Sequence, residues 1–281
     1  MNEETIERTS DLALTAWDLA RLRKQLPDSE RGQTMFLRTH QRLLDSFESA
    51  REIPPAHRSL LRCNEAAGAS CLLIHGVSTP PGDLRLLADQ LFAAGANVYV
   101  LRLPDFGHNE HTISEVSWAA SLERARQSCR LLARGGGRLH VVGLGFGAAL
   151  ALLLTKTERL SSLVLLAPAI MPRESFFQRM VVRLRLHRLG AVHRWLGWNA
   201  DLVEGMDQAR GRLGQIRVPI FAAQCEDDDR ASPASLRFLQ RKARHKASRF
   251  RVFPTGGHAI LAAHGEETLH AEITRFCELN G

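Results

Sequence analysis

A glycine-dense turn between two apolar runs, over residues 139–152, restricts the fold of this chain more than any other feature. The segment reads LHVVGLGFGAALAL. Its first residues are those of a buried β-strand, and the alanine and leucine run after the turn is typical of a buried helix. The turn carries Gly143, Gly145 and Gly147, which allow a sharp reversal at positive φ and a close approach of strand end and helix start. We therefore expect the chain to be organised around this strand–turn–helix unit.

The spacing of these glycines is that of a nucleophile elbow, G-x-S-x-G, which holds a serine on a strained turn above a sheet. In this chain the central position is Gly145, and its neighbours are Leu144 and Phe146. Ser128 and Cys129 fall in the preceding predicted helix and are not expected to replace the missing nucleophile. The sequence therefore predicts an elbow without a nucleophile.

Strand-like and helix-like segments alternate on both sides of the elbow. Apolar strands are expected at 70–75, 97–103, 139–142, 162–166, 218–224 and 250–253, with a short first strand at 59–63. Helices are expected at 83–94, 114–133, 146–157, 233–244 and 266–279. Strands that are apolar on both faces and alternate with helices indicate a mostly parallel sheet covered by helices on both sides, which is an α/β fold.

The chain is expected to have two parts. Residues 1–58 form a helical extension, with one apolar face between residues 12 and 26 and a second periodic segment at 31–51 that Pro54 and Pro55 end. These helices either pack on the core or contact a partner, and Arg21, Arg23 and Lys24 lie among the apolar positions of the first. Residues 59–281 form the α/β domain.

One insertion interrupts the alternation, at about residues 170–215. It is rich in bulky apolar residues interleaved with arginine, followed by Trp195 and Trp198. Because it follows a strand at the carboxyl edge of the sheet, we interpret it as a helical lid over the elbow. Its composition fits peripheral contact with a membrane surface, and it fits a solvated basic helix equally well.

Composition limits the class of partner. The net charge is +7, yet there is one tyrosine and no strand with interleaved aromatic and basic residues, which argues against nucleic acid. The first residues, MNEETIERTS, lack the basic and apolar regions of a signal peptide. With no apolar run long enough to span a bilayer, a cytoplasmic location is expected. The scattered cysteines, Cys71 and Cys225 among them, are expected to be reduced.

Four motifs occur in the order and at the spacing of a known superfamily. They are LLIHG at 72–76, LPDFGH at 103–108, GLGFG at 143–147 and GGH at 256–258. Together they resemble the α/β-hydrolase superfamily, in its bacterial carboxylesterase and monoacylglycerol-lipase-like branch. The resemblance covers about residues 60–280.

The resemblance implies a role for particular residues. The backbone N–H groups of Val77, after His75-Gly76, and of Phe146, after the elbow centre, would form an oxyanion hole. His258 would be the base. The acid lies in the CEDDDRASP segment that follows a strand, where the family spacing selects Asp228, with Asp227 and Asp229 as neighbouring alternatives. The order nucleophile, acid, histidine is that of the superfamily.

The resemblance further implies carboxylic esters of medium acyl chains, or monoacylglycerol-like lipids, as the substrate class. No cofactor is expected, and the remaining histidines show no metal-ligand spacing, so no metal is expected. Because Gly145 cannot form an acyl-enzyme, three interpretations stand. The chain is a pseudo-hydrolase that binds a ligand or partner, an esterase disabled by a serine-to-glycine change, or an enzyme whose Asp228 and His258 act directly on water or substrate.

Overall fold

The computed structural model of the chain describes residues 30–104, 106, 117–171, 184 and 200–280. The expected helical face at 12–26 lies outside these residues. So do half of the LPDFGH motif and most of the expected lid.

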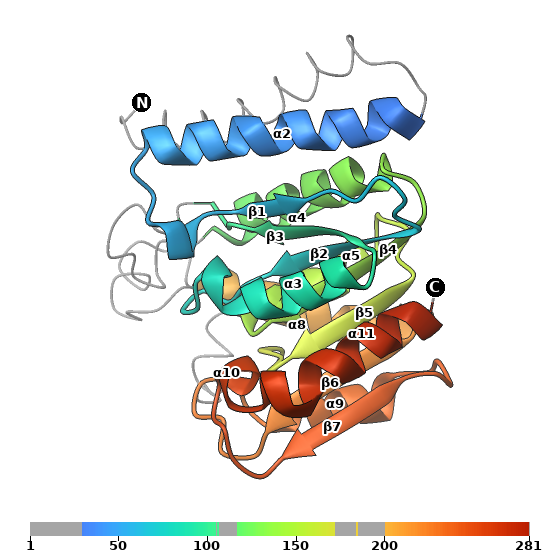
Figure 1. Cartoon of the computed structure of the whole chain (residues 1–281). Coiled ribbons are helices and arrows are strands. Elements are labelled where there is room, and N and C mark those ends of the chain that lie inside the picture. Colours follow the sequence, from blue (N-terminus) through green and yellow to red (C-terminus); the bar gives the residue numbers. More distant parts are fainter. Residues whose placement is uncertain (1–29, 105, 107–116, 172–183, 185–199, 281) are drawn as a thin grey trace.

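A seven-stranded sheet forms the centre, in the order β1-β3-β2-β4-β5-β6-β7 (Figure 1). Neighbouring strands are parallel except for β1, which pairs with β3 in the antiparallel sense. The strands are β1 (Leu60–Arg62), β2 (Ala69–Ile74), β3 (Asn97–Leu101), β4 (Arg138–Leu144), β5 (Ser162–Leu166), β6 (Ile220–Cys225) and β7 (Arg249–Phe253). The predicted α/β fold with a mostly parallel sheet is confirmed.

The strands β2 to β6 are buried on both faces, and their successive side chains point to opposite faces of the sheet. In β2, Leu72 and Ile74 join one core cluster, while Cys71 and Leu73 join the other. The first cluster is covered by α4 (Trp118–Ala133), α5 (Phe146–Leu154), α8 (Ala200–Arg212) and α9 (Ala234–Lys242). The second is covered by α3 (Arg85–Ala93), α10 (Ile260–His264) and α11 (His270–Leu279) (Figure 1). This explains why the central strands read as continuous apolar runs.

Helix α2 (Glu30–Ala50) is the described part of the N-terminal extension, and it lies along the β1 edge of the sheet (Figure 1). Its buried residues Phe36, Leu37 and Leu44 belong to the same core cluster as the sheet. Of the two roles left open by the sequence, α2 takes the first and packs on the core.

Several predicted boundaries differ in the structure. The strand expected at 97–103 ends at Leu101, because the N–H groups of Arg102 and Leu103 donate to the side chains of Ser59 and His75 instead of a neighbouring strand. The helix expected at 83–94 begins with a 3₁₀ turn at Pro81–Leu84. The helix expected at 266–279 is preceded by α10 and by a π-helical turn at Gly265–Leu269.

The carboxyl-terminal part of the expected lid is helix α8, which packs against α5. Leu202, Val203 and Ala209 are buried in it. At Gly205 the indole of Trp118 lies so close that an added Cβ would overlap it. This part of the insertion therefore belongs to the body of the fold, and the lid stays a prediction for the residues outside the described ranges. Among the described helices, none is long and apolar enough to cross a membrane.

Candidate active site

The elbow is formed where β4 ends and α5 begins. Gly145 lies between them with φ 57° and ψ −114°, a backbone conformation that residues other than glycine rarely adopt. Its N–H donates to the carbonyl of Leu166, and its carbonyl accepts from Ala148 and Ala169. The turn is thus fixed by β5 and by its own helix, and the predicted elbow conformation is present without a side chain at its centre.

Gly143 and Gly147 are required by close packing rather than by their torsion angles. A Cβ at Gly143 would lie 2.3 Å from the carbonyl oxygen of Gly147, and one at Gly147 would lie 2.2 Å from the carbonyl oxygen of Ile74. Both distances are far below van der Waals contact. The outer glycines of the motif therefore allow α5 to begin directly against the ends of β4 and β2.

Asp228 is the carboxylate that contacts the histidine. It follows β6, is fully buried, and lies 3.1 and 3.2 Å from Nδ1 of His258 through its two oxygens. Oδ1 also accepts from the N–H groups of Arg230 and Ala231, and Oδ2 lies 3.4 Å from the side-chain amide of Gln224. Burial acts to raise the pKa of Asp228, but the hydrogen bonds from His258, Ala231 and Arg230 outweigh it and hold the pKa below its ordinary value. The group is therefore an ionised acceptor.

The two neighbouring aspartates lie elsewhere. Asp227 accepts hydrogen bonds from the N–H groups of Gly256 and Gly257, at 3.2 and 2.8 Å, and so holds the turn that carries His258. Asp229 is exposed. Of the three candidates, the structure brings Asp228 to the imidazole, and Asp227 supports that arrangement through the backbone.

The imidazole of His258 lies over the centre of the elbow. Its side chain is 9% exposed. With Nδ1 directed at a carboxylate, Nδ1 carries the proton that it donates, and Nε2 is left facing Gly145. A Cβ at Gly145 would lie 2.9 Å from Nε2 and 3.2 Å from Cε1. Asp228 and His258 are thus held together beside the position that a side chain at Gly145 would occupy.

The loop after β2 approaches the elbow from the other side. The Cα of Gly76 lies 3.8 Å from the position of a Cβ at Gly145, and a Cβ at Gly76 would lie 3.9 Å from the backbone nitrogen of Phe146. Val77, half-buried, follows at this edge. Phe146 is the first residue of α5, so its N–H precedes the first hydrogen bond within the helix. The Phe146 N–H and Gly76, the residue before Val77, therefore adjoin the same point of the elbow.

His75 holds this loop as a neutral side chain. Its Nε2 accepts from the N–H of Leu103 at 3.0 Å, so Nδ1 carries the proton and donates to the carbonyl of Gly76 at 2.6 Å. Complete burial lowers the pKa of His75 to about 4. The N–H of Gly76 donates in turn to Thr79 Oγ1 at 2.9 Å. Both backbone groups of Gly76 are therefore fixed by side chains.

The sequence did not identify the residues that support the site. Thr79 and Asp227 act on backbone groups, and a hydroxyl or carboxylate in a loop carries no spacing that would reveal such a role. Arg230 donates to Ser78 Oγ at 2.8 Å and so connects the acid loop to the loop after β2, across a large separation in the chain. Within the described ranges, no group of three or more His, Cys, Asp or Glu side chains is arranged to hold a metal ion.

Comparisons with solved structures identify similar folds. One chain from the structural work on LipS and LipT, two metagenome-derived lipolytic enzymes, is similar with a TM-score of 0.68 and 15% identity. The match covers 80% of this chain and 99% of that one. A monoacylglycerol lipase of Paleococcus ferrophilus is similar with a TM-score of 0.62 and 18% identity, and the match covers 75% of this chain and 95% of that one. A thermophilic esterase of Thermogutta terrifontis is similar with a TM-score of 0.59 and 17% identity, and the match covers 80% of this chain and 94% of that one.

These structures share the fold at low identity. A search of curated protein sequences gave no significant match. The sequence itself matches the Alpha/beta hydrolase family over residues 71–271, which includes the loop after β2, the elbow, the acid loop and His258. The chain belongs to the alpha/beta hydrolase family.

Proposed function

We propose that this chain binds an acyl compound, a carboxylic ester or a related lipid-like acid, over the elbow at Gly145, and that it does so without forming an acyl-enzyme. The observation that carries the proposal is the assembly of Asp228, His258 and the loop after β2 around an elbow whose central residue has no side chain. The fold neighbours include lipolytic enzymes and esterases, which supports an acyl ligand.

The ligand would be held by its carbonyl or carboxylate oxygen. The N–H groups of Val77 and Phe146 would donate to that oxygen, and the amino-terminal end of α5 favours negative charge at the same point. Nε2 of His258 would face the carbonyl carbon or the second oxygen. Since Gly145 offers no hydroxyl, the covalent route that the superfamily uses is closed in this chain.

A second function rests on the orientation of His258. Its Nδ1 is paired with an ionised carboxylate, and Nε2 has no partner among the described residues. An imidazole held in this way can take a proton from water. Hydrolysis would then proceed by attack of that water on an ester carbonyl held in the oxyanion hole, with no covalent intermediate.

The experiment compares hydrolysis of p-nitrophenyl butyrate by the parent chain, by Gly145→Ser and by Gly145→Ala. We expect the parent to be inert and Gly145→Ser to turn over, because only a nucleophile is missing. Turnover by the parent that His258→Ala abolishes would support the water route instead. If Gly145→Ser is inert and the parent binds no butyrate or p-nitrophenyl butyrate by calorimetry, the site does not accept acyl compounds and the proposal fails.

Membrane contact is a separate proposal that rests on the basic and apolar composition of residues 170–215. It predicts that the chain associates with vesicles containing anionic lipid and that salt abolishes the association. Vesicles of phosphatidylcholine alone are the matched control. Equal association with both kinds of vesicle would contradict an electrostatic contact.

A further inference from the structure

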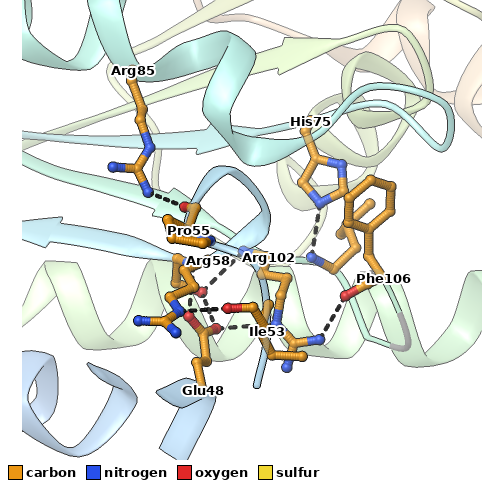
Figure 2. Close-up of polar contacts among 10 residues, drawn as sticks. Glu48, Ile53, Pro55, Arg58, His75, Arg85, Arg102 and Phe106 are labelled. Carbon is orange, nitrogen blue, oxygen red and sulfur yellow. Dashed lines mark hydrogen bonds and ion pairs between the residues drawn. The ribbon is translucent and has the colours of Figure 1, made fainter. Parts of the chain in front are cut away.

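Helix α2 is joined to the candidate site by a continuous chain of buried and half-buried contacts. Figure 2 shows its side chains, from Glu48 on α2 to His75 beside the elbow. Glu48 is 1% exposed and lies near the carboxyl end of α2. A carboxylate this deep in a protein is stable only when paired and hydrogen-bonded, so its partners define what it does.

The partners of Glu48 lie at the ends of two strands. Oε2 accepts from the N–H of Ser59 at 2.8 Å, and Oε1 accepts from the Ser59 hydroxyl at 2.8 Å and from Nε of Arg102 at 3.1 Å. The Ser59 hydroxyl oxygen also accepts from the N–H of Arg102 at 3.2 Å. Arg102 follows β3 and is 5% exposed, so this is a buried ion pair between α2 and the carboxyl edge of the sheet.

The next contact leads towards the site. Nη1 of Arg102 donates to the carbonyl of Phe106 at 2.9 Å (Figure 2). The ring of Phe106 lies against the ring of His75, with centroids 4.5 Å apart. The N–H of Leu103, the residue after Arg102, donates to Nε2 of that same imidazole. The segment held by Arg102 thus contacts His75 at one ring face and at one ring nitrogen.

His75 also fixes the loop that carries Val77. Its second nitrogen, Nδ1, donates to the carbonyl of Gly76. Gly76 itself lies beside both Gly145 and Phe146. We propose that Glu48 and Arg102 are positioning residues for the loop after β2, residues 75–79, here called the oxyanion loop. Helix α2 then helps to fix the position of the Val77 N–H. The inference rests on the proposed function for the role of that N–H, but the positioning itself is measurable without any reaction.

The test uses Arg102→Lys and Glu48→Gln in the otherwise unchanged chain. Lysine keeps the positive charge beside Glu48 but lacks the planar fork that also reaches Phe106. Glutamine keeps the shape of Glu48 and removes its charge. The matched control is Arg38→Gln, which removes an exposed ion pair of the same helix, between Arg38 and Glu65.

Hydrogen–deuterium exchange of the Gly76 and Leu103 amides is the first readout, because the Leu103 amide donates to His75 and the Gly76 amide donates to Thr79 within the loop that His75 holds. We expect the rise in exchange at Gly76 and Leu103 to exceed the rise in β5 by at least about tenfold in Arg102→Lys and Glu48→Gln, with no effect of Arg38→Gln. If exchange rises equally at Gly76 and throughout β5, the pair supplies global stability only, and the inference is overturned. Unchanged exchange at Gly76 in a folded Arg102→Lys overturns it as well.

The second readout is hydrolysis in the Gly145→Ser background. A misplaced oxyanion donor lowers kcat with little change in KM, and we expect a loss of about tenfold or more for Arg102→Lys and none for Arg38→Gln. An inert Gly145→Ser chain together with a parent that binds no butyrate would contradict the proposed function, while the exchange result would still decide the positioning role. A loss confined to KM would contradict positioning of the oxyanion loop.

Discussion

Nε2 of His258 lies 2.9 Å from the point that a Cβ at Gly145 would occupy. This separation is shorter than real Cβ contacts, so the imidazole lies partly in the space that a side chain at the elbow would need. The nearest atom is the end of a side chain, and a shift of a few tenths of an ångström would admit a Cβ. The elbow and its base are therefore close to, but not identical with, an arrangement that holds a nucleophile.

Comparing Gly145→Ser with Gly145→Ala should distinguish the catalytic effect of a hydroxyl from the loss of stability that any side chain causes at this position. Both place a side chain at φ 57°, and each should lower the free energy of unfolding by about 1–3 kcal/mol. Only the serine supplies a nucleophile, so p-nitrophenyl butyrate hydrolysis should be at least about a hundredfold faster in Gly145→Ser than in Gly145→Ala. Urea unfolding and initial rates measure the two effects. Equal rates in both variants would mean that Asp228 and His258 do not activate the hydroxyl.

Asp227 and Asp229 form a natural pair for testing support of the histidine turn. Asp227→Ala removes the acceptor of the Gly256 and Gly257 N–H groups, while Asp229→Ala alters an exposed neighbour. In the Gly145→Ser background we expect Asp227→Ala to lower kcat about tenfold, because the imidazole loses its fixed approach, and Asp229→Ala to leave it unchanged. Equal effects would show that the loop charge matters rather than these bonds.

Buried histidines should make the protein sensitive to mild acid. Burial lowers the pKa of His75 and His140 to about 4 and that of His40 to about 3, all below the ordinary 6.5. The unfolded chain therefore binds more protons as the pH falls below 6.5. Each histidine should then remove about 1.4 kcal/mol of stability per pH unit until its folded pKa is reached.

His140 is the clearest site for checking this acid sensitivity, because it lies on β4 away from the elbow and contacts Ser162. In His140→Asn the stability lost between pH 7 and pH 5, measured by urea unfolding, should be smaller than in the parent chain. Identical losses would show that His140 does not account for any of the proton uptake.

The sequence was sufficient to predict features that consist of neighbouring residues, such as the strands and the elbow. It did not predict contacts between residues that are far apart in the chain. The apolar segments predicted every strand of the sheet, and those of β2 to β6 are apolar almost throughout because these strands are buried on both faces. The elbow was recognised because its glycines are required locally, by a positive φ at Gly145 and by close packing at Gly143 and Gly147. Both features are properties of contiguous residues.

The chain of contacts from α2 to His75 had no such signal. Glu48 and Ser59 are 11 residues apart and Glu48 and Arg102 are 54 apart, and nothing local distinguishes Glu48 from the exposed acidic residues of a helix. Choosing Asp228 among three adjacent aspartates was an inference from family spacing. The physical reason, that Asp228 is fully buried and its neighbours are exposed, emerges only when β6 and β7 are paired.

The ion pair between Glu48 and Arg102 should contribute far more to stability than the ion pair at the surface of the same helix. Glu48→Ala leaves the guanidinium of Arg102, 5% exposed, without its carboxylate, and should lower the free energy of unfolding by about 3–5 kcal/mol. Arg38→Ala removes an ion pair whose side chains are 53% and 73% exposed, and should change the free energy by less than about 1 kcal/mol. Urea unfolding of both variants at the same ionic strength measures the difference. If the two losses are similar, water must reach Arg102 when Glu48 is removed, and the connection between α2 and the sheet edge is weaker than its burial indicates.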